Sequence, residues 1–143
     1  MSPPRTRLVL ADDHLGIATV LGQLLERDYD LVATVRDGLE LVDVAIRLRP
    51  EVIVADMNMP SLSGLDALRR LQRQEIRIKF VLLTTDGDPA LAAETFRAGG
   101  SAYLLKHSAT EELHTAIEEV LQGRRYLTPQ IANGVIAALA NGS

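Results

Sequence analysis

The stretch Val52-Ile53-Val54-Ala55-Asp56-Met57-Asn58-Met59-Pro60 decides the fold. Its first four residues are all apolar, and the run stops at Asp56 before a loop broken by Pro60. A short run that is apolar at every position is typical of a strand buried on both faces, as in the parallel sheet of an α/β protein. An acid directly after such a strand lies at its carboxyl end, where open α/β sheets bind ligands. The stretch therefore predicts a parallel sheet with a site near Asp56.

The same pattern continues on both sides of this stretch, because short apolar runs alternate with longer amphipathic segments. Asp37 is expected to cap the second helix, Gly123 to end the fifth, and Thr128-Pro129 to begin the last one. This alternation predicts an α/β, flavodoxin-like fold: a doubly wound five-stranded parallel sheet of order 2-1-3-4-5 with five helices plus an extra C-terminal helix. Strands are expected over residues 8–11, 31–35, 52–56, 80–83 and 102–105, and helices over about 15–26, 37–48, 64–71, 90–98, 110–122 and 129–140.

Length and composition fit one domain with short extensions. The chain has 143 residues, a net charge of −4 and no cysteine, which excludes disulfides and thiolate metal sites and gives no bulk attraction to nucleic acid. We expect a disordered leader over residues 1–6, one domain over 7–122, and a linker with the last helix over 123–143. The sequence shows no signal peptide and no run long enough to span a bilayer, so a cytoplasmic protein without membrane contact is expected.

Polar residues follow four of the five expected strands. Asp12 and Asp13 come after the first, Asp56 ends the third, Thr84 follows the fourth and Lys106 the fifth. Carboxylates brought together at one sheet edge repel one another unless a cation lies among them, and all-oxygen ligands suit Mg²⁺. The lysine and the threonine hydroxyl supply donors for an anion. The combination predicts Mg²⁺-dependent phosphoryl transfer to a carboxylate, with Asp56 as the acceptor.

Each of these residues also has a simpler interpretation. An isolated aspartate after a strand usually caps the next helix, and an isolated lysine lies at the surface. The phosphoryl-transfer hypothesis depends on all five groups falling at one edge of the sheet. His14, His107 and His114 have no i, i+4 partner histidine, so we expect helix-start or surface histidines rather than metal ligands.

Four motifs occur in order at the ends of the expected strands: Asp12-Asp13-His14, Asp56-Met57-Asn58-Met59-Pro60 with Gly64, Thr84-Thr85 and Tyr103-Leu104-Leu105-Lys106. With these motifs, residues 7–122 resemble the receiver domain of two-component response regulators, which is a signalling domain that accepts phosphate rather than an enzyme acting on a substrate. This resemblance implies that Asp56 is the phosphoacceptor. It further implies that Asp13, Asp56 and the backbone carbonyl of Asn58 bind Mg²⁺, with Asp12 in the same acidic pocket.

The resemblance also implies how phosphorylation is transmitted. Lys106 is expected to pair with the phosphoryl group, Thr84 to move its hydroxyl onto it, and Tyr103 to rotate inward. Thr85 stands beside the switch threonine and is larger than the alanine or glycine often found there. The expected output surface comprises the fourth helix, the fifth strand and the fifth helix.

Residues 123–132 resemble the junction after the receiver in NarL/FixJ-type (LuxR-like) regulators, where a helix-turn-helix domain normally follows. A sensor histidine kinase is then the implied partner, and a homodimer a further expected assembly. No lysine or arginine follows Arg125, so the chain as given is not expected to bind DNA, which would require a further C-terminal domain. An excised piece of a longer regulator and a shortened regulator both fit, and we favour the excised piece.

Two alternatives remain open. Haloacid-dehalogenase-type phosphatases also form an aspartyl phosphate, but they need an acid two positions after the nucleophile, where this chain has Asn58. A receiver-like interaction module that does not use phosphate is the other. The stripe of Ile131, Val135, Ile136 and Leu139 supports it, because this stripe needs burial against the same domain, a further domain or a second copy.

Overall fold

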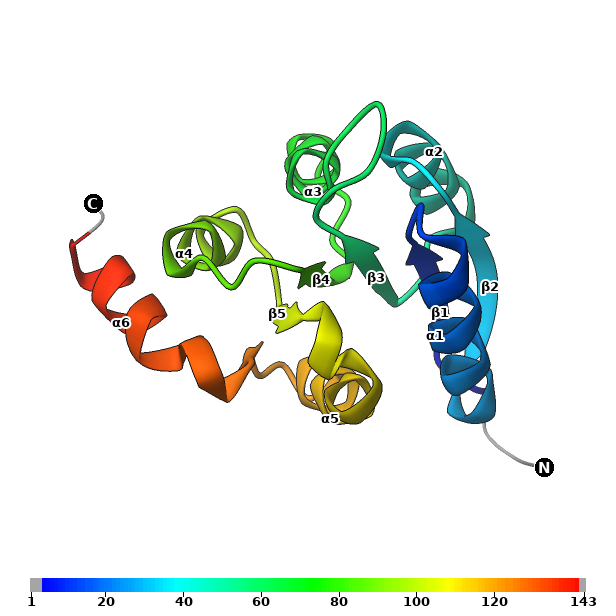
Figure 1. The fold of residues 1–143 in the computed structure, drawn as a ribbon. Helices are drawn as coiled ribbons and strands as arrows, with labels where there is room; N and C mark the ends of the chain where they lie inside the picture. Colours follow the sequence, from blue (N-terminus) through cyan, green and yellow to red (C-terminus); the bar gives the residue numbers. More distant parts are fainter. Residues whose placement is uncertain (1–3, 142–143) are drawn as a thin grey trace.

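The computed structural model describes residues 4–141 and contains one sheet of strand order β2-β1-β3-β4-β5-β6 (Figure 1). Every pair of neighbouring strands is parallel, which confirms the predicted doubly wound α/β fold. The expected disordered leader stays a prediction, and its residues 1–3 lie outside the described part of the chain. The strands are β1 (Arg7–Ala11), β2 (Asp30–Val35), β3 (Val52–Asp56), β4 (Lys79–Thr84), β5 (Ala102–Leu105) and β6 (Tyr126–Leu127).

The expected strand count of five was wrong, because the described chain has a sixth strand at the β5 edge. The two residues of β6 pair in parallel with Ala102 and Tyr103. A backbone hydrogen bond from the N–H of Tyr126 to the carbonyl of Ser101 begins this pairing, and one from Thr128 to Tyr103 ends it. Two residues are too few to show a strand pattern, so sequence reasoning assigned this segment to a linker.

Helices cover both faces of the sheet. α1 (Leu15–Asp28) and α5 (Ala109–Leu121) lie on one face, and α2 (Gly38–Leu48), α3 (Gly64–Arg73) and α4 (Pro89–Arg97) lie on the other (Figure 1). Successive residues of β3 alternate between these layers. Val52 and Val54 pack with α1 and α5, whereas Ile53 and Ala55 pack with α2, α3 and α4. This double burial explains the uninterrupted apolar run.

Two of the expected helix ends are confirmed. The Asp37 side chain accepts a hydrogen bond from the N–H of Glu40 and caps α2. Gly123 follows α5 with a φ of 81°, and the N–H groups of Gly123 and Arg124 donate to carbonyls of the last turn. Glycine is favoured at such a left-handed position because it has no Cβ.

The extra C-terminal helix is also confirmed, and it packs on the domain itself. A short 3₁₀ turn, η2 (Pro129–Ile131), leads into α6 (Ala132–Asn141), which lies beside α4 (Figure 1). The Val135 side chain is buried in the same apolar cluster as α4, while 64% of Ile136 and 38% of Leu139 stay exposed. The predicted apolar stripe is therefore buried in part against its own domain. No helix in the described residues is long and apolar enough to cross a membrane.

Gly38 holds the loop after β3 against the start of α2. A Cβ at this position would lie 2.0 Å from the carbonyl oxygen of Leu62, and the Gly38 N–H donates to the carbonyl of Pro60. Because both neighbours are backbone, we expect Gly38→Ala to lower the free energy of unfolding by about 3 kcal/mol. Urea denaturation of the variant and the wild type would measure this difference in the free energy of unfolding.

Gly16→Ala is the matched control for this substitution. A Cβ at Gly16 meets no atom within 4 Å, so alanine inside α1 is expected to add up to about 1 kcal/mol of stability. Equal stabilities of the two variants would contradict the role given to Gly38.

Candidate functional site

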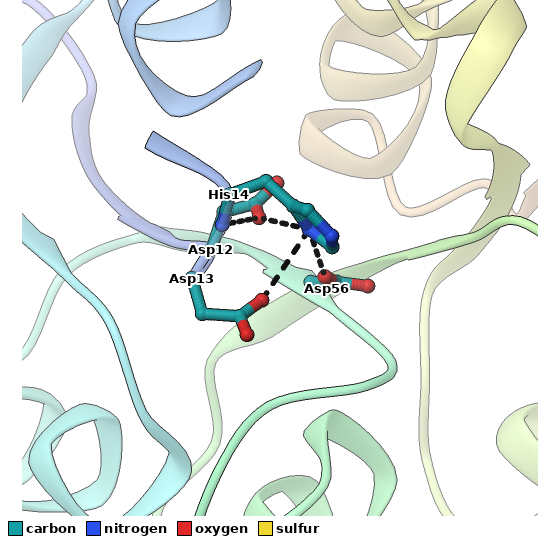
Figure 2. Close-up of side chains that lie close together, drawn as sticks. All are labelled: Asp12, Asp13, His14 and Asp56. Atoms are coloured by element: carbon teal, nitrogen blue, oxygen red, sulfur yellow. Dashed lines mark hydrogen bonds and ion pairs between the residues drawn. The ribbon is translucent and has the colours of Figure 1, made fainter. Parts of the chain in front are cut away.

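Three carboxylates meet at the carboxyl ends of the central strands (Figure 2). β1 and β3 are neighbours, with Ala11 paired to Ala55, so the residues that follow them lie side by side. Asp12 and Asp56 are each only 1% exposed, while Asp13 is partly exposed at the rim. The predicted sheet edge therefore brings the three aspartates together.

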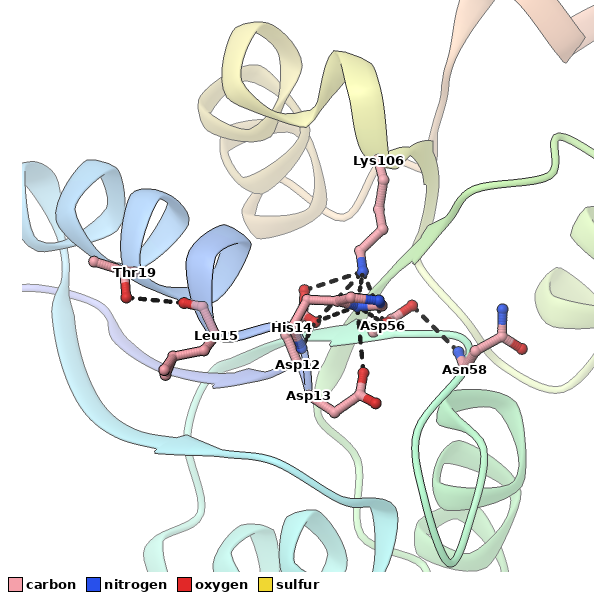
Figure 3. Close-up of polar contacts among 8 residues, drawn as sticks. All are labelled: Asp12, Asp13, His14, Leu15, Thr19, Asp56, Asn58 and Lys106. Atoms are coloured by element: carbon pink, nitrogen blue, oxygen red, sulfur yellow. Dashed lines mark hydrogen bonds and ion pairs between the residues drawn. The ribbon is translucent and has the colours of Figure 1, made fainter.

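Lys106 supplies the positive charge at this edge (Figure 3). It begins the 3₁₀ turn η1 (Lys106–Ser108) directly after β5, and its side chain is 5% exposed. Its Nζ lies 2.8 Å from Asp56 Oδ2 and 3.3 Å from Asp12 Oδ2. One buried ammonium thus pairs with two buried carboxylates, and removing it would leave both without a direct counter-charge.

The loop after β3 turns back toward Asp56. The backbone N–H of Asn58 donates to Asp56 Oδ1 over 3.2 Å, and the Asn58 side chain is exposed (Figure 3). Gly64 keeps this loop close, because a Cβ there would lie 2.5 Å from the backbone oxygen of Asp56. Asn58, two residues after the acceptor candidate, is therefore held by its backbone N–H rather than by its side chain.

His14 lies within the cluster, which the sequence interpretation did not anticipate (Figure 2). As expected, it stands at the start of a helix, α1, and its side chain is 57% exposed. Its Nδ1, however, lies 3.3 Å from oxygens of both Asp12 and Asp13 and 3.6 Å from Asp56 Oδ2. The lack of a histidine at i, i+4 argued against a place for His14 in a metal site. Its position directly after Asp12 and Asp13 was the signal in the sequence that it lies beside these acids.

The donor set fits a divalent cation. Asp12, Asp13, His14 and Asp56 offer ligand atoms within 4.8 Å of one another, and three carboxylates face one ammonium. Asp13 Oδ1 is buried and accepts no hydrogen bond from the described residues. Lys106 Nζ lies 3.0 Å from His14 Nδ1, so the ammonium and the imidazole border the same carboxylates. A cation among these atoms would remove the remaining repulsion.

Thr84, Thr85 and Tyr103, the other predicted site residues, make no hydrogen bond or ion pair with the acidic cluster. The buried Thr84 hydroxyl exchanges two hydrogen bonds with the backbone of Asp86, in the loop that follows β4. Thr85 is exposed and lines a groove beside Lys106. Tyr103 is fully buried, its hydroxyl makes no hydrogen bond within residues 4–141, and this burial raises the pKa of its phenol.

Comparison with known proteins identifies the family. The model of the response regulator receiver domain matches residues 8–118. The chain belongs to the response regulator receiver domain family. A receiver is a signalling domain rather than a classical enzyme, and the predicted resemblance is confirmed.

Relatives of the receiver place it with LuxR-type regulators. It is 33% identical over 131 residues to a nitrate/nitrite response regulator protein homolog of Haemophilus influenzae, covering 90% of this chain and 63% of that protein. It is 29% identical to the transcriptional regulatory protein DegU of Brevibacillus brevis, covering 92% of this chain and 57% of DegU. The chain thus spans about three fifths of the length of these relatives.

Solved structures agree with this placement. A LuxR-family two-component response regulator from Aurantimonas sp. SI85-9A1 superposes with a TM-score of 0.88 at 30% identity, covering 96% of this chain and 99% of the other. The signal receiver domain of the putative response regulator NarL from Mycobacterium tuberculosis has a TM-score of 0.81 at 23% identity and covers 85% of this chain and all of its own, which supports the shared fold.

Proposed function

We propose that this receiver accepts a phosphoryl group on Asp56 in a Mg²⁺-dependent reaction. The observation that carries the proposal is the Lys106–Asp56 pair of 2.8 Å beside a buried Asp13 oxygen without a hydrogen bond. An oxygen of the Asp56 carboxylate attacks phosphorus, the bond from phosphorus to the donor breaks, and the leaving group keeps that electron pair.

Each neighbour of Asp56 has a distinct part in the proposal. Asp13, Asp56 and the backbone carbonyl of Asn58 would hold Mg²⁺, with Asp12 in the same pocket. The ion neutralises charge on the phosphoryl oxygens when it is bound. Lys106 already faces Asp56. Its ammonium therefore stays beside the phosphorylated side chain and pairs with the phosphoryl oxygens.

Transmission of the signal involves the residues outside the cluster. A dianion on Asp56 needs further hydrogen-bond donors, and the Thr84 hydroxyl supplies one by leaving Asp86. Thr85 moves with it at the rim, and Tyr103 turns into the space vacated. The α4, β5 and α5 surface then changes and controls a transcriptional output domain or dimerisation.

A sensor histidine kinase is the proposed phosphoryl donor. An apolar groove between α1 and η1 borders Lys106 and offers such a partner a contact surface next to Asp56. The first half of α1 adds exposed apolar side chains, with Leu15 at 66% and Val20 at 48% exposure. The remaining expectations (a homodimer, DNA contact through a further C-terminal domain and a cytoplasmic location) stay predictions.

Removal of the metal tests the proposal directly. Incubation with acetyl phosphate and Mg²⁺ is expected to add the mass of a phosphoryl group to the intact protein, and excess EDTA to prevent it, because the unscreened carboxylates repel the donor. Intact-mass spectrometry reads both. Uptake that is equal in EDTA would overturn the metal requirement. The failure of any adduct would leave an interaction module that does not use phosphate, whereas multiple turnover of a small phosphoester would favour a phosphatase.

A further inference from the structure

The segment after α5 is hydrogen-bonded to the strand that carries Tyr103. Thr128 is fully buried, and its backbone N–H donates to the carbonyl of Tyr103 over 3.1 Å. Its hydroxyl accepts from the N–H of Leu105 over 3.0 Å instead of capping η2, the role expected from the sequence. The segment is therefore fixed to the sheet one residue before Lys106.

The same segment packs against the loop that follows Thr84. A Cβ on Gly87 would lie 2.9 Å from Ile131 Cγ2 and 3.0 Å from Leu105 Cδ2, so Ile131 rests directly on this loop. The Thr84 hydroxyl fixes the loop through its two bonds with Asp86. A chain of contacts thus runs from the end of β4 to η2.

α6 packs along α4, and these two helices contact each other more extensively than any other pair of helices in residues 4–141. Val135 is the residue of α6 that is buried, and a Cβ on Gly134 would lie 2.7 Å from Pro89, the first residue of α4. Arg97, at the other end of α4, donates to the carbonyl of Ala138 over 3.1 Å. Because α6 is held by close backbone approach at Gly134 and Ala138, docking depends on the position of the loop and of α4 beneath it.

We propose that α6 is the occupant of the α4 surface in the unphosphorylated receiver, and that phosphorylation of Asp56 releases it. When the Thr84 hydroxyl turns to the phosphoryl group, its bonds to Asp86 break and the Gly87 loop moves away from Ile131. The contact between Ile131 and this loop, which supports the start of α6, is then lost. α6 leaves α4 while β5 stays in the sheet. This inference rests on the function proposed above, and it identifies α6 as the element that responds to phosphorylation.

Single thiols can test the release, because the chain has no cysteine. Val135→Cys places a thiol between α6 and α4, Ile136→Cys is the exposed control, and Val54→Cys reports on the sheet core. Maleimide labelling rates are compared with and without Mg²⁺ and beryllofluoride. We expect labelling of Val135→Cys to become about tenfold faster, with the other two rates unchanged. Hydrogen exchange of the unmodified chain should likewise rise over residues 132–141.

The outcomes separate this inference from the proposed function. Asp56→Asn in the Val135→Cys background should abolish the acceleration. A phosphoryl adduct on the wild type together with unchanged labelling and exchange would overturn the release of α6 and leave phosphorylation standing. An equal rise at Val54→Cys would mean general unfolding and would also overturn it. Absence of both adduct and response would overturn the proposed function, and the inference with it.

Discussion

Asp56→Asn is expected to abolish the phosphoryl adduct that acetyl phosphate forms on the wild-type chain. An amide is nearly the same size as the carboxylate but is a poor nucleophile toward phosphorus, so the acceptor is removed while the pocket keeps its shape. Lys106 retains a buried partner in Asp12, at 3.3 Å, so the variant is expected to stay folded. Intact-mass spectrometry measures the adduct, and circular dichroism verifies the fold.

Asp43→Asn is the matched control for this prediction. Asp43 lies on α2, its side chain is 71% exposed and it pairs with Arg47 at the surface, so its replacement should leave the adduct unchanged. An adduct that persists in Asp56→Asn would assign the acceptor to Asp12 or Asp13, and peptide mapping would distinguish these two. Loss of the adduct in both variants would point to a general effect of charge.

The sequence was sufficient to predict five of the six strands and the sheet edge at which the acidic residues meet, because both follow from local patterns. Val52 to Ala55 are buried on both faces, and such a run has few structural solutions. Parallel strands bring their carboxyl ends to one edge, so the sequence alone places Asp12, Asp13, Asp56 and Lys106 together. The match to the receiver family spans all four of these residues.

Other features depend on the direction of a side chain or on the pairing of very short strands. Neither can be predicted from the pattern of a single sequence. The sequence predicts a helix-start or surface residue at His14, and the direction of its side chain brings Nδ1 to the acids. Thr84 lies at the same edge of the sheet as Asp56, yet its hydroxyl is hydrogen-bonded to Asp86 in the loop after β4. The apolar stripe of α6 required a partner, but the sequence offered several, and contacts at Val135 and Gly134 select α4.

Lys106→Met is expected to lower the free energy of unfolding by about 3 kcal/mol in the absence of divalent cations. The substitution keeps a long side chain that packs in the same space, but it removes the ammonium. Asp12 and Asp56, whose side chains are 0% and 2% exposed, would then be buried without this counter-charge. The cost arises from these carboxylates and not from a cavity, so it should depend on what other cation is present.

Mg²⁺ provides the decisive comparison for this variant. A cation that binds the native pocket and not the unfolded chain stabilises in proportion to RT ln(1 + [L]/Kd), and without Lys106 it meets a more negative pocket. Urea denaturation should therefore show a larger gain from Mg²⁺ in Lys106→Met than in the wild type. Lys79→Met, at an exposed position of β4, is the control and should change little in either condition. If Lys106→Met were as stable as the wild type without Mg²⁺, the ammonium would not be compensating these carboxylates, and the electrostatic basis of the site would have to be abandoned.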